Sequence, residues 1–411
     1  MFNFRMLKLS DAFLWIAMSA LIIIGLLAIF SSTGSMQIKL GLDSLVYLKR
    51  QFIAFLVGAV GMALFCYFDY QHFKKAVPYF YGIMLIFLIA ILFAGAGSQG
   101  AQRWFQLGFF SFQPSEISKI IMVICLASFF SKRKNLGSWD SLALLSLVGL
   151  PFILIFKQPD LGTALVFVFI LVGMLTSSWS SPRLLALLVT PMLSMLFRPV
   201  LILWIIYLLL LCLILFLRRS SFIDWLLILG INIGVGVAMP LIWGMLKVYQ
   251  RQRILSFLNP ASDPYGAGYH SIQSMIAIGS GGFFGKGFLH GTQTQLQFIP
   301  EQHSDFIFSA LGEEFGFIGA ITVVFLFAIV IWRALKISSE AIDGFGSLLA
   351  SGIAVMTAFH VFANIGMTLG LLPVVGIPLP FISYGGSSLL MHMIAIGILQ
   401  SVAMRRQKII F

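Results

Sequence analysis

Twelve long apolar runs divide this chain, and charged residues are nearly confined to the breaks between them. Runs of this kind are the sequence signature of helices that cross a lipid bilayer. Only 10% of the 411 residues are charged, which is too few to solvate the surface of an ordinary soluble enzyme. We therefore predict an all-α polytopic membrane protein whose residues 1–411 form one integral membrane domain. The runs lie at about 12–30, 52–68, 79–94, 117–130, 142–156, 161–175, 184–197, 200–217, 225–246, 306–332, 345–369 and 388–404.

The basic residues predict how the chain is oriented in the membrane. An even number of spans places both termini on one side, and cytoplasmic segments of membrane proteins carry an excess of Lys and Arg. With both termini inside, 15 Lys and Arg fall in inside segments and 10 in outside segments. We therefore expect cytoplasmic termini. The net charge of +12 has the same origin and implies no nucleic acid partner. The terminal basic residues are Arg5, Lys8, Arg405, Arg406 and Lys408.

Residues 246–305 form the only long hydrophilic segment, and the predicted orientation places it outside the cell. Long loops in compact membrane proteins usually carry function, so a site is expected where this loop meets the bundle. Arg251, Arg253 and Lys286 are its candidate anion-binding cations. The three cysteines and six histidines show no metal-binding spacing, so no metal site is predicted.

Two polar motifs open apolar runs, and each has a structural and a functional interpretation. Glu116 and Lys119 are three residues apart on one helical face, which suits either a buried ion pair that locks two helices together or direct substrate contact. Asp160 follows a proline at the start of a run, where it would cap the helix or take part in chemistry. Arg103, in the preceding outer loop, would bind an anionic headgroup or anchor the chain at the interface.

Acidic residues are densest at the junction between the long loop and the following run. Four of the 14 acids fall here: Glu301, Asp305, Glu313 and Glu314. Asp305 stands at the start of the run, beside His303 and Ser304, where burial and nearby cations can tune a carboxylate for base chemistry. A helix cap is the competing interpretation, but a cap needs one acid rather than four, so catalysis is favoured.

The motifs together resemble the SEDS family of cell-wall polymerases (RodA, FtsW and SpoVE), over most of the chain and with its elongation branch, RodA, the more similar. The resemblance implies a ten-span helical bundle, to which residues 184–217 add an apolar hairpin. Ser304 stands where the family usually has Thr. The matching segments are 100–104, 113–119, 158–163, 249–253, 263–287, 300–316 and 380–387, the last of which contains Ser383.

The resemblance implies a peptidoglycan glycosyltransferase that polymerises lipid II during cell elongation, on the outer face of the cytoplasmic (inner) membrane. A class B penicillin-binding protein and the elongation machinery are the implied partners. Asp305 is the implied essential carboxylate, and as a general base it would take a proton from the acceptor sugar as that sugar attacks the anomeric carbon, in an inverting displacement. Cations would hold the diphosphate of lipid II or of the undecaprenyl-linked glycan. The candidates are Arg103, Lys119, Arg251, Arg253 and Lys286.

Two further questions stay open at the level of sequence. A divalent cation, Mg²⁺ or Mn²⁺, would fit the diphosphate chemistry, but the sequence holds no recognisable metal cage, so no cofactor is assigned. Two rival functions are a lipid II transporter, or flippase, and a noncatalytic scaffold for the penicillin-binding protein. The transporter reading rests on Glu116, Lys119 and Asp160, because ionisable residues at membrane depth often line transport pathways.

Overall fold

A computed structural model describes most of the chain, and ten helices in the described part are long and apolar enough to span a membrane. The predicted ten-span helical bundle is confirmed, and the protein is a multi-pass membrane protein. The described residues are 9–39, 43–95, 103–107, 110–133, 138–178, 182–219, 221–246, 248–259, 266 and 268–406. Arg5, Lys8 and Lys408, used for the predicted orientation, lie outside these ranges. The ten helices are α2 (Ala12–Lys39), α3 (Val46–Tyr67), α4 (Tyr70–Ala94), α5 (Pro114–Ser131), α6 (Ser138–Lys157), α7 (Leu161–Ser178), α10 (Phe222–Met245), α14 (Ile307–Glu340), α15 (Gly344–Thr368) and α16 (Gly386–Met404).

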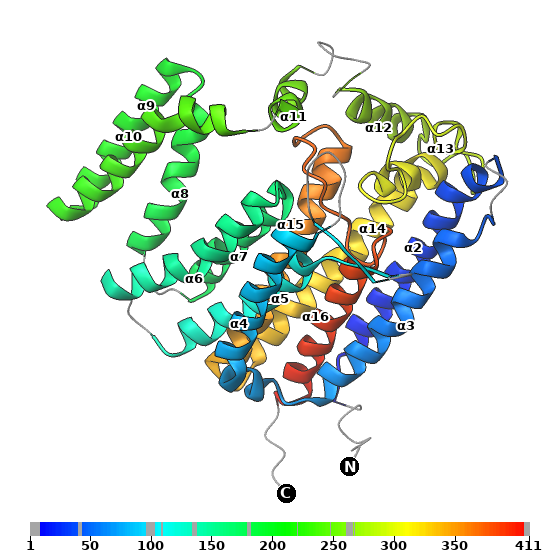
Figure 1. The fold of residues 1–411 in the computed structure, drawn as a ribbon, viewed down its shortest axis with the longest axis horizontal. Helices are drawn as coiled ribbons and strands as arrows, with labels where there is room; N and C mark the ends of the chain where they lie inside the picture. Colours follow the sequence, from blue (N-terminus) through cyan, green and yellow to red (C-terminus); the bar gives the residue numbers. More distant parts are fainter. Residues whose placement is uncertain are drawn as a thin grey trace, which may run out of the picture.

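Helices α5, α15 and α16 form the centre of the bundle (Figure 1). The span of α16 is 89% buried and that of α5 is 83% buried, against 17% for the peripheral α4. Small residues allow this close packing, as is usual between helices in membranes. A side chain at Gly352 of α15 would come within 2.6 Å of Val123 in α5, and one at Gly397 of α16 would come within 2.5 Å of the Met62 carbonyl oxygen in α3.

Residues 184–217 lie in two shorter helices, α8 (Pro182–Phe197) and α9 (Leu201–Leu217), which pack with α10. The three helices form a lobe beside the main bundle, and α8 also contacts α7 (Figure 1). The lobe has a small core of its own around Leu211, Leu215 and Ile228. That these helices are an addition to a ten-span core stays a prediction.

The segment from residue 246 to residue 305 contains three helices, so its description as a long loop was incomplete. They are α11 (Val248–Leu258), α12 (Tyr269–Ser280) and the single turn α13 (Thr292–Gln295). The end of this segment is held by Glu313, in the second turn of α14. That carboxylate accepts hydrogen bonds from the backbone N–H groups of Gln293 and Thr294, both at 2.9 Å, and pairs with Lys286 at 2.8 Å.

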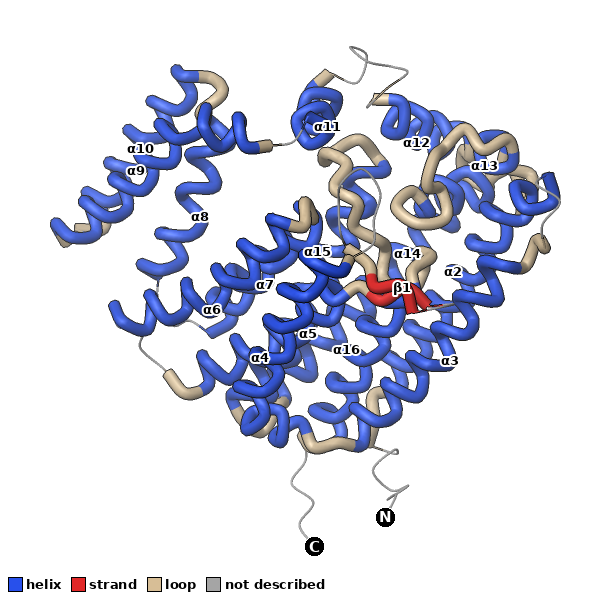
Figure 2. The backbone as a smooth tube through the Cα atoms, viewed as in Figure 1, coloured by secondary structure: helices blue, strands red, loops and turns tan. Residues whose placement is uncertain are grey.

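Two non-helical segments lie among the helices and shape the site. Strands β1 (Phe105–Leu107) and β2 (Phe110–Phe112) pair antiparallel, with Gln106 opposite Ser111, and lie beside the central helices (Figure 2). The segment between α15 and α16, residues 369–385, is irregular, and its residues 377 and 379–383 are buried. Irregular backbone at membrane depth is tolerated where protein surrounds it or where it lines a cavity. Here the Asn364 side chain donates to the Ile377 carbonyl at 2.8 Å, and Tyr384 N–H donates to the His303 carbonyl at 2.9 Å.

Candidate active site

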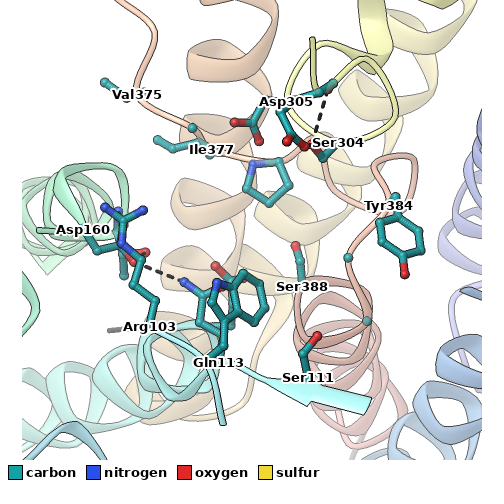
Figure 3. A pocket seen from close by; sticks show the side chains of 18 of the residues that line it. Arg103, Ser111, Gln113, Asp160, Ser304, Asp305, Val375, Ile377, Tyr384 and Ser388 are labelled. Atoms are coloured by element: carbon teal, nitrogen blue, oxygen red, sulfur yellow. Dashed lines mark hydrogen bonds between the residues drawn. The ribbon is translucent and has the colours of Figure 1, made fainter. Parts of the chain in front are cut away.

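A pocket of about 510 Å³ opens where several helices begin, at the junction predicted from the acidic residues. Residues preceding or opening α5, α7, α14 and α16 line it, together with the β1–β2 hairpin and the 369–385 segment. Figure 3 shows Arg103, Gln113 and Asp160 on one side of the pocket, and Ser304 and Asp305 on another. Its charged lining residues are Arg103, Glu116, Lys119, Asp160, Arg253, Glu301 and Asp305.

The amino ends of four helices meet at this pocket. The first residues of a helix leave backbone N–H groups without intrahelical partners, and the helix dipole makes this end positive, so anions are favoured there. At α5, α14 and α16 no side chain supplies a capping bond from the N-cap positions, which are Gln113, Phe306 and Gly385. The arrangement suits an anionic group such as a phosphate.

Asp305 lies two residues before the first residue of α14 and points into the pocket (Figure 3). Its side chain is partly exposed to the pocket, and within the described part of the chain its carboxylate makes no hydrogen bond. The N-cap residue of α14 is Phe306, so the Asp305 side chain does not serve as the cap. A Cβ at Gly376 would lie 3.3 Å from Asp305 Oδ2, and Gly376 has φ +71°, which favours glycine. Glycine therefore keeps one side of the carboxylate open.

The surroundings of Asp305 raise the pKa of its carboxyl to about 6, from an ordinary value of 3.8. Burial is the largest cause, and the nearby Glu301 carboxylate raises the pKa further; Arg253 and Arg103 act in the opposite direction. A pKa near 6 leaves the group mostly ionised at neutral pH and more basic than an ordinary aspartate, which suits a general base. Burial also lowers the pKa of His303, against the pull of Glu301, which favours a neutral imidazole at neutral pH.

Asp160 and Arg103 line the pocket and also make hydrogen bonds that stabilise the surrounding backbone. The Asp160 carboxylate accepts the Thr163 backbone N–H at 3.1 Å, so it caps α7 as predicted, and it also accepts from Gln113 and Ser115, both at 3.2 Å. Arg103 donates to the carbonyl oxygens of Gln158 and Pro159. These bonds brace the loop before α7 while leaving both charged groups at the pocket wall.

Glu116 and Lys119 form a buried ion pair at 2.6 Å, as one of their two interpretations predicted, but both residues belong to α5, so the pair itself lies within one helix. The same two side chains line the pocket, so their position also suits the second interpretation, direct contact with a substrate. Lys119 also contacts the His360 ring of α15 at 3.0 Å. His360 could not have been selected from the sequence, because it is a lone histidine within an apolar run.

Not all of the candidate residues reach the pocket. Arg253, His303 and Ser304 line it, and the His303 ring packs against Tyr47 and Tyr384. Lys286 instead pairs with Glu313, and Arg251 donates to the carbonyls of Leu246 and Gly244. Ser383 is buried and donates to the Ser304 carbonyl at 2.6 Å, so it supports the pocket from behind. No group of three or more His, Cys, Asp or Glu side chains suited to a metal occurs among the described residues.

Comparison with known proteins agrees with the resemblance seen in the motifs. The chain is 38% identical over 399 residues to the peptidoglycan glycosyltransferase MrdB of Escherichia coli K12, covering 97% of this chain and 94% of that protein. It is 36% identical over 427 residues to the peptidoglycan glycosyltransferase RodA of Treponema pallidum, and the match covers 96% of this chain and 98% of that protein. A chain from a peptidoglycan synthase complex that coordinates polymerization and crosslinking superposes with a TM-score of 0.72 at 26% identity. The superposition covers 97% of this chain and 99% of that chain.

The family model of the FtsW, RodA and SpoVE proteins, described as cell cycle proteins, matches residues 11–209 and residues 178–408. These two matches overlap and together span nearly the whole chain. The resemblance predicted from the motifs is therefore confirmed. This chain belongs to the FtsW/RodA/SpoVE family of cell cycle proteins.

Proposed function

We propose that this protein is a peptidoglycan glycosyltransferase of cell elongation, which polymerises lipid II with Asp305 as its general base. Relatives that match almost the whole chain carry the name peptidoglycan glycosyltransferase, so the chain is an enzyme of this class. The observation that carries the choice of base is the Asp305 carboxylate, which makes no hydrogen bond among the residues that the structure describes and faces a pocket at the meeting point of four helix amino ends.

The reaction needs one base and an environment that accepts negative charge. Asp305 would take the proton from the acceptor sugar hydroxyl as its oxygen attacks the anomeric carbon of the donor, and the bond from that carbon to the lipid diphosphate breaks. The charge that develops on the leaving diphosphate would be stabilised by Arg103 and Arg253, which line the pocket, and by the amino ends of α5 and α16. Attack from the face opposite the leaving group inverts the anomeric centre.

The proposal also includes the side of the membrane on which the pocket lies. The pocket lies at the start of α16, whereas Gln400, near the end of that helix, bonds to Asp11 at the start of the chain's first span. Asp11 and Gln400, close to the two ends of the described chain, therefore lie at the end of the bundle opposite the pocket. With cytoplasmic termini, as the basic residues predict, the pocket faces outward.

A class B penicillin-binding protein is the proposed partner, supported by the likeness to a chain from a synthase complex that polymerises and crosslinks.

Reconstitution with lipid II tests the proposal. Purified protein mixed with its penicillin-binding protein partner and lipid II should form glycan polymer, and Asp305→Asn should lower the rate by about 100-fold or more. Asp11→Asn is a matched control, because it removes a buried, paired carboxylate at the other end of the bundle, and it should retain polymerisation. Normal polymerisation by Asp305→Asn would refute the base assignment. Movement of lipid II across liposomes without polymer would favour a transporter.

A further inference from the structure

The ion pair at the bottom of the pocket is held in a fixed orientation by His360. Lys119 Nζ donates to Glu116 Oε1 at 2.6 Å and to His360 Nε2 at 3.0 Å. His360 Nδ1 donates to the Met356 carbonyl at 2.8 Å, which assigns the ring proton to Nδ1 and makes Nε2 the acceptor. The imidazole in this arrangement is neutral. An ammonium group has three N–H bonds, so one of them remains for a further acceptor.

Glu116 has a free oxygen at the same place. Its Oε2 atom is buried and has no hydrogen-bond partner within the described part of the chain, although the residue is only 3% exposed. A buried carboxylate oxygen without a donor is costly, and such atoms in native structures usually meet a ligand or water. Glu116 and Lys119 both line the pocket, together with Ser388 from the first turn of α16. We call these three residues the pocket floor.

The remaining wall carries the guanidinium groups of Arg103 and Arg253 beside the carboxylates of Asp160, Glu301 and Asp305, whereas the pocket floor carries one charge of each sign. The Glu116 and Lys119 charges cancel, and the His360 ring and the His392 ring packed against it are neutral: His392 donates Nδ1–H to the Ser388 carbonyl at 2.9 Å, as His360 does to the Met356 carbonyl. A phosphate oxygen only accepts hydrogen bonds, and it would meet the free Glu116 oxygen as a like charge. A hydroxyl group can accept from Lys119 and donate to Glu116 Oε2 at once. The floor is therefore complementary to a hydroxyl group.

We propose that the pocket floor binds a hydroxyl group of the sugar in the lipid-linked substrate, and that His360 positions Lys119 for this contact. The diphosphate then lies against Arg103 and Arg253, at the other charged part of the wall. This inference rests on the proposed glycosyltransferase function and deepens it, because it separates the part of the pocket that recognises sugar from the part that recognises phosphate.

Binding to two probes tests the assignment without requiring catalysis. Lipid II carries sugars, and undecaprenyl diphosphate carries the same lipid and diphosphate without them. Glu116→Gln leaves an oxygen for Lys119 but removes the charged acceptor, so the affinity for lipid II should fall by about tenfold while that for undecaprenyl diphosphate stays unchanged. Asp11→Asn should change neither affinity. An equal loss for both probes, or no loss for lipid II, would overturn the proposal.

A second pair of variants tests the positioning role of His360. His360→Leu removes the acceptor for Lys119 and should weaken lipid II binding selectively, whereas His360→Gln offers a side-chain oxygen and should restore most of the affinity. If both variants only lower the melting temperature and leave the ratio of the two affinities unchanged, His360 has no positioning role. These outcomes are independent of Asp305, so they can fail while polymerisation by the unmodified protein stands.

Discussion

Asp305 and Glu313 lie within eight residues of each other at the start of α14, yet their surroundings are opposite. Glu313 is buried and receives two backbone N–H groups, the Thr294 hydroxyl and the Lys286 ammonium. Asp305 receives none of these and faces a pocket. A carboxylate whose lone pairs are all occupied serves structure, and one left without donors remains available for a proton. Acid density in the sequence predicted the region, but hydrogen bonding separates the two roles.

The largest effect expected from this comparison is on stability. Glu313→Ala removes the acceptor for two backbone N–H groups and leaves the Lys286 charge without its partner, so unfolding should become easier by about 3 kcal/mol. Asp305→Asn should leave the melting temperature equal or higher. The sign follows from the pKa: a folded-state value raised to about 6 means that at pH 7 folding disfavours the charged form, and asparagine removes that charge.

Thermal unfolding in one detergent measures both variants, and hydrogen exchange over residues 286–296 reports the loop itself. Exchange should rise in Glu313→Ala and stay unchanged in Asp305→Asn. Equal melting temperatures for the unmodified protein and Glu313→Ala would show that the hydrogen bonds to Glu313 contribute little to the fold.

The sequence predicted the spans and the position of the site for clear physical reasons. Lipid excludes charge, so the apolar runs and their breaks define the helices. Asp305 could be selected because a carboxylate beside a membrane span is energetically costly, and such residues usually have a functional role. The same cluster of acids also contains Glu313 and Glu314. Their spacing in the sequence does not show which of these carboxylates accept hydrogen bonds from other parts of the chain. Glu314 bonds to Ser31 and so joins α14 to α2.

The remainder of the site depends on contacts between distant parts of the chain. The 369–385 segment has no helical or strand periodicity to predict, and its path is held by bonds such as that from Ser383 to the Ser304 carbonyl, 79 residues away in sequence. His360 gains its role only because α15 packs against α5. Within the hydrophilic segment, helices α11 and α12 were not predicted, because the segment is rich in polar residues and contains no long apolar run.

A glycine pair tests whether the open side of Asp305 matters. Gly376 and Gly282 both have positive φ, +71° and +58°, so alanine strains the backbone at either position by about 1 kcal/mol. Only at Gly376 would the new Cβ approach Asp305 Oδ2, at 3.3 Å, whereas at Gly282 it meets open space. Polymerisation should therefore fall by about tenfold in Gly376→Ala, as expected for crowding of a reacting group. Equal rates in the two variants would mean that the space beside Asp305 is not used.

The smallest effect, and the most specific, is a shift in pH dependence. Since the base must be ionised, the polymerisation rate should fall about tenfold per pH unit below pH 6, near the pKa of Asp305. Glu301→Gln removes a charge that raises this pKa, so the acidic limb should move to lower pH. Arg253→Gln removes a charge that lowers it, so the limb should move to higher pH. Each profile is scaled to its own plateau, which separates the shift from any loss of substrate binding by Arg253. Shifts of the same sign in both variants would exclude Asp305 as the group that titrates, because the two charges act on it in opposite directions.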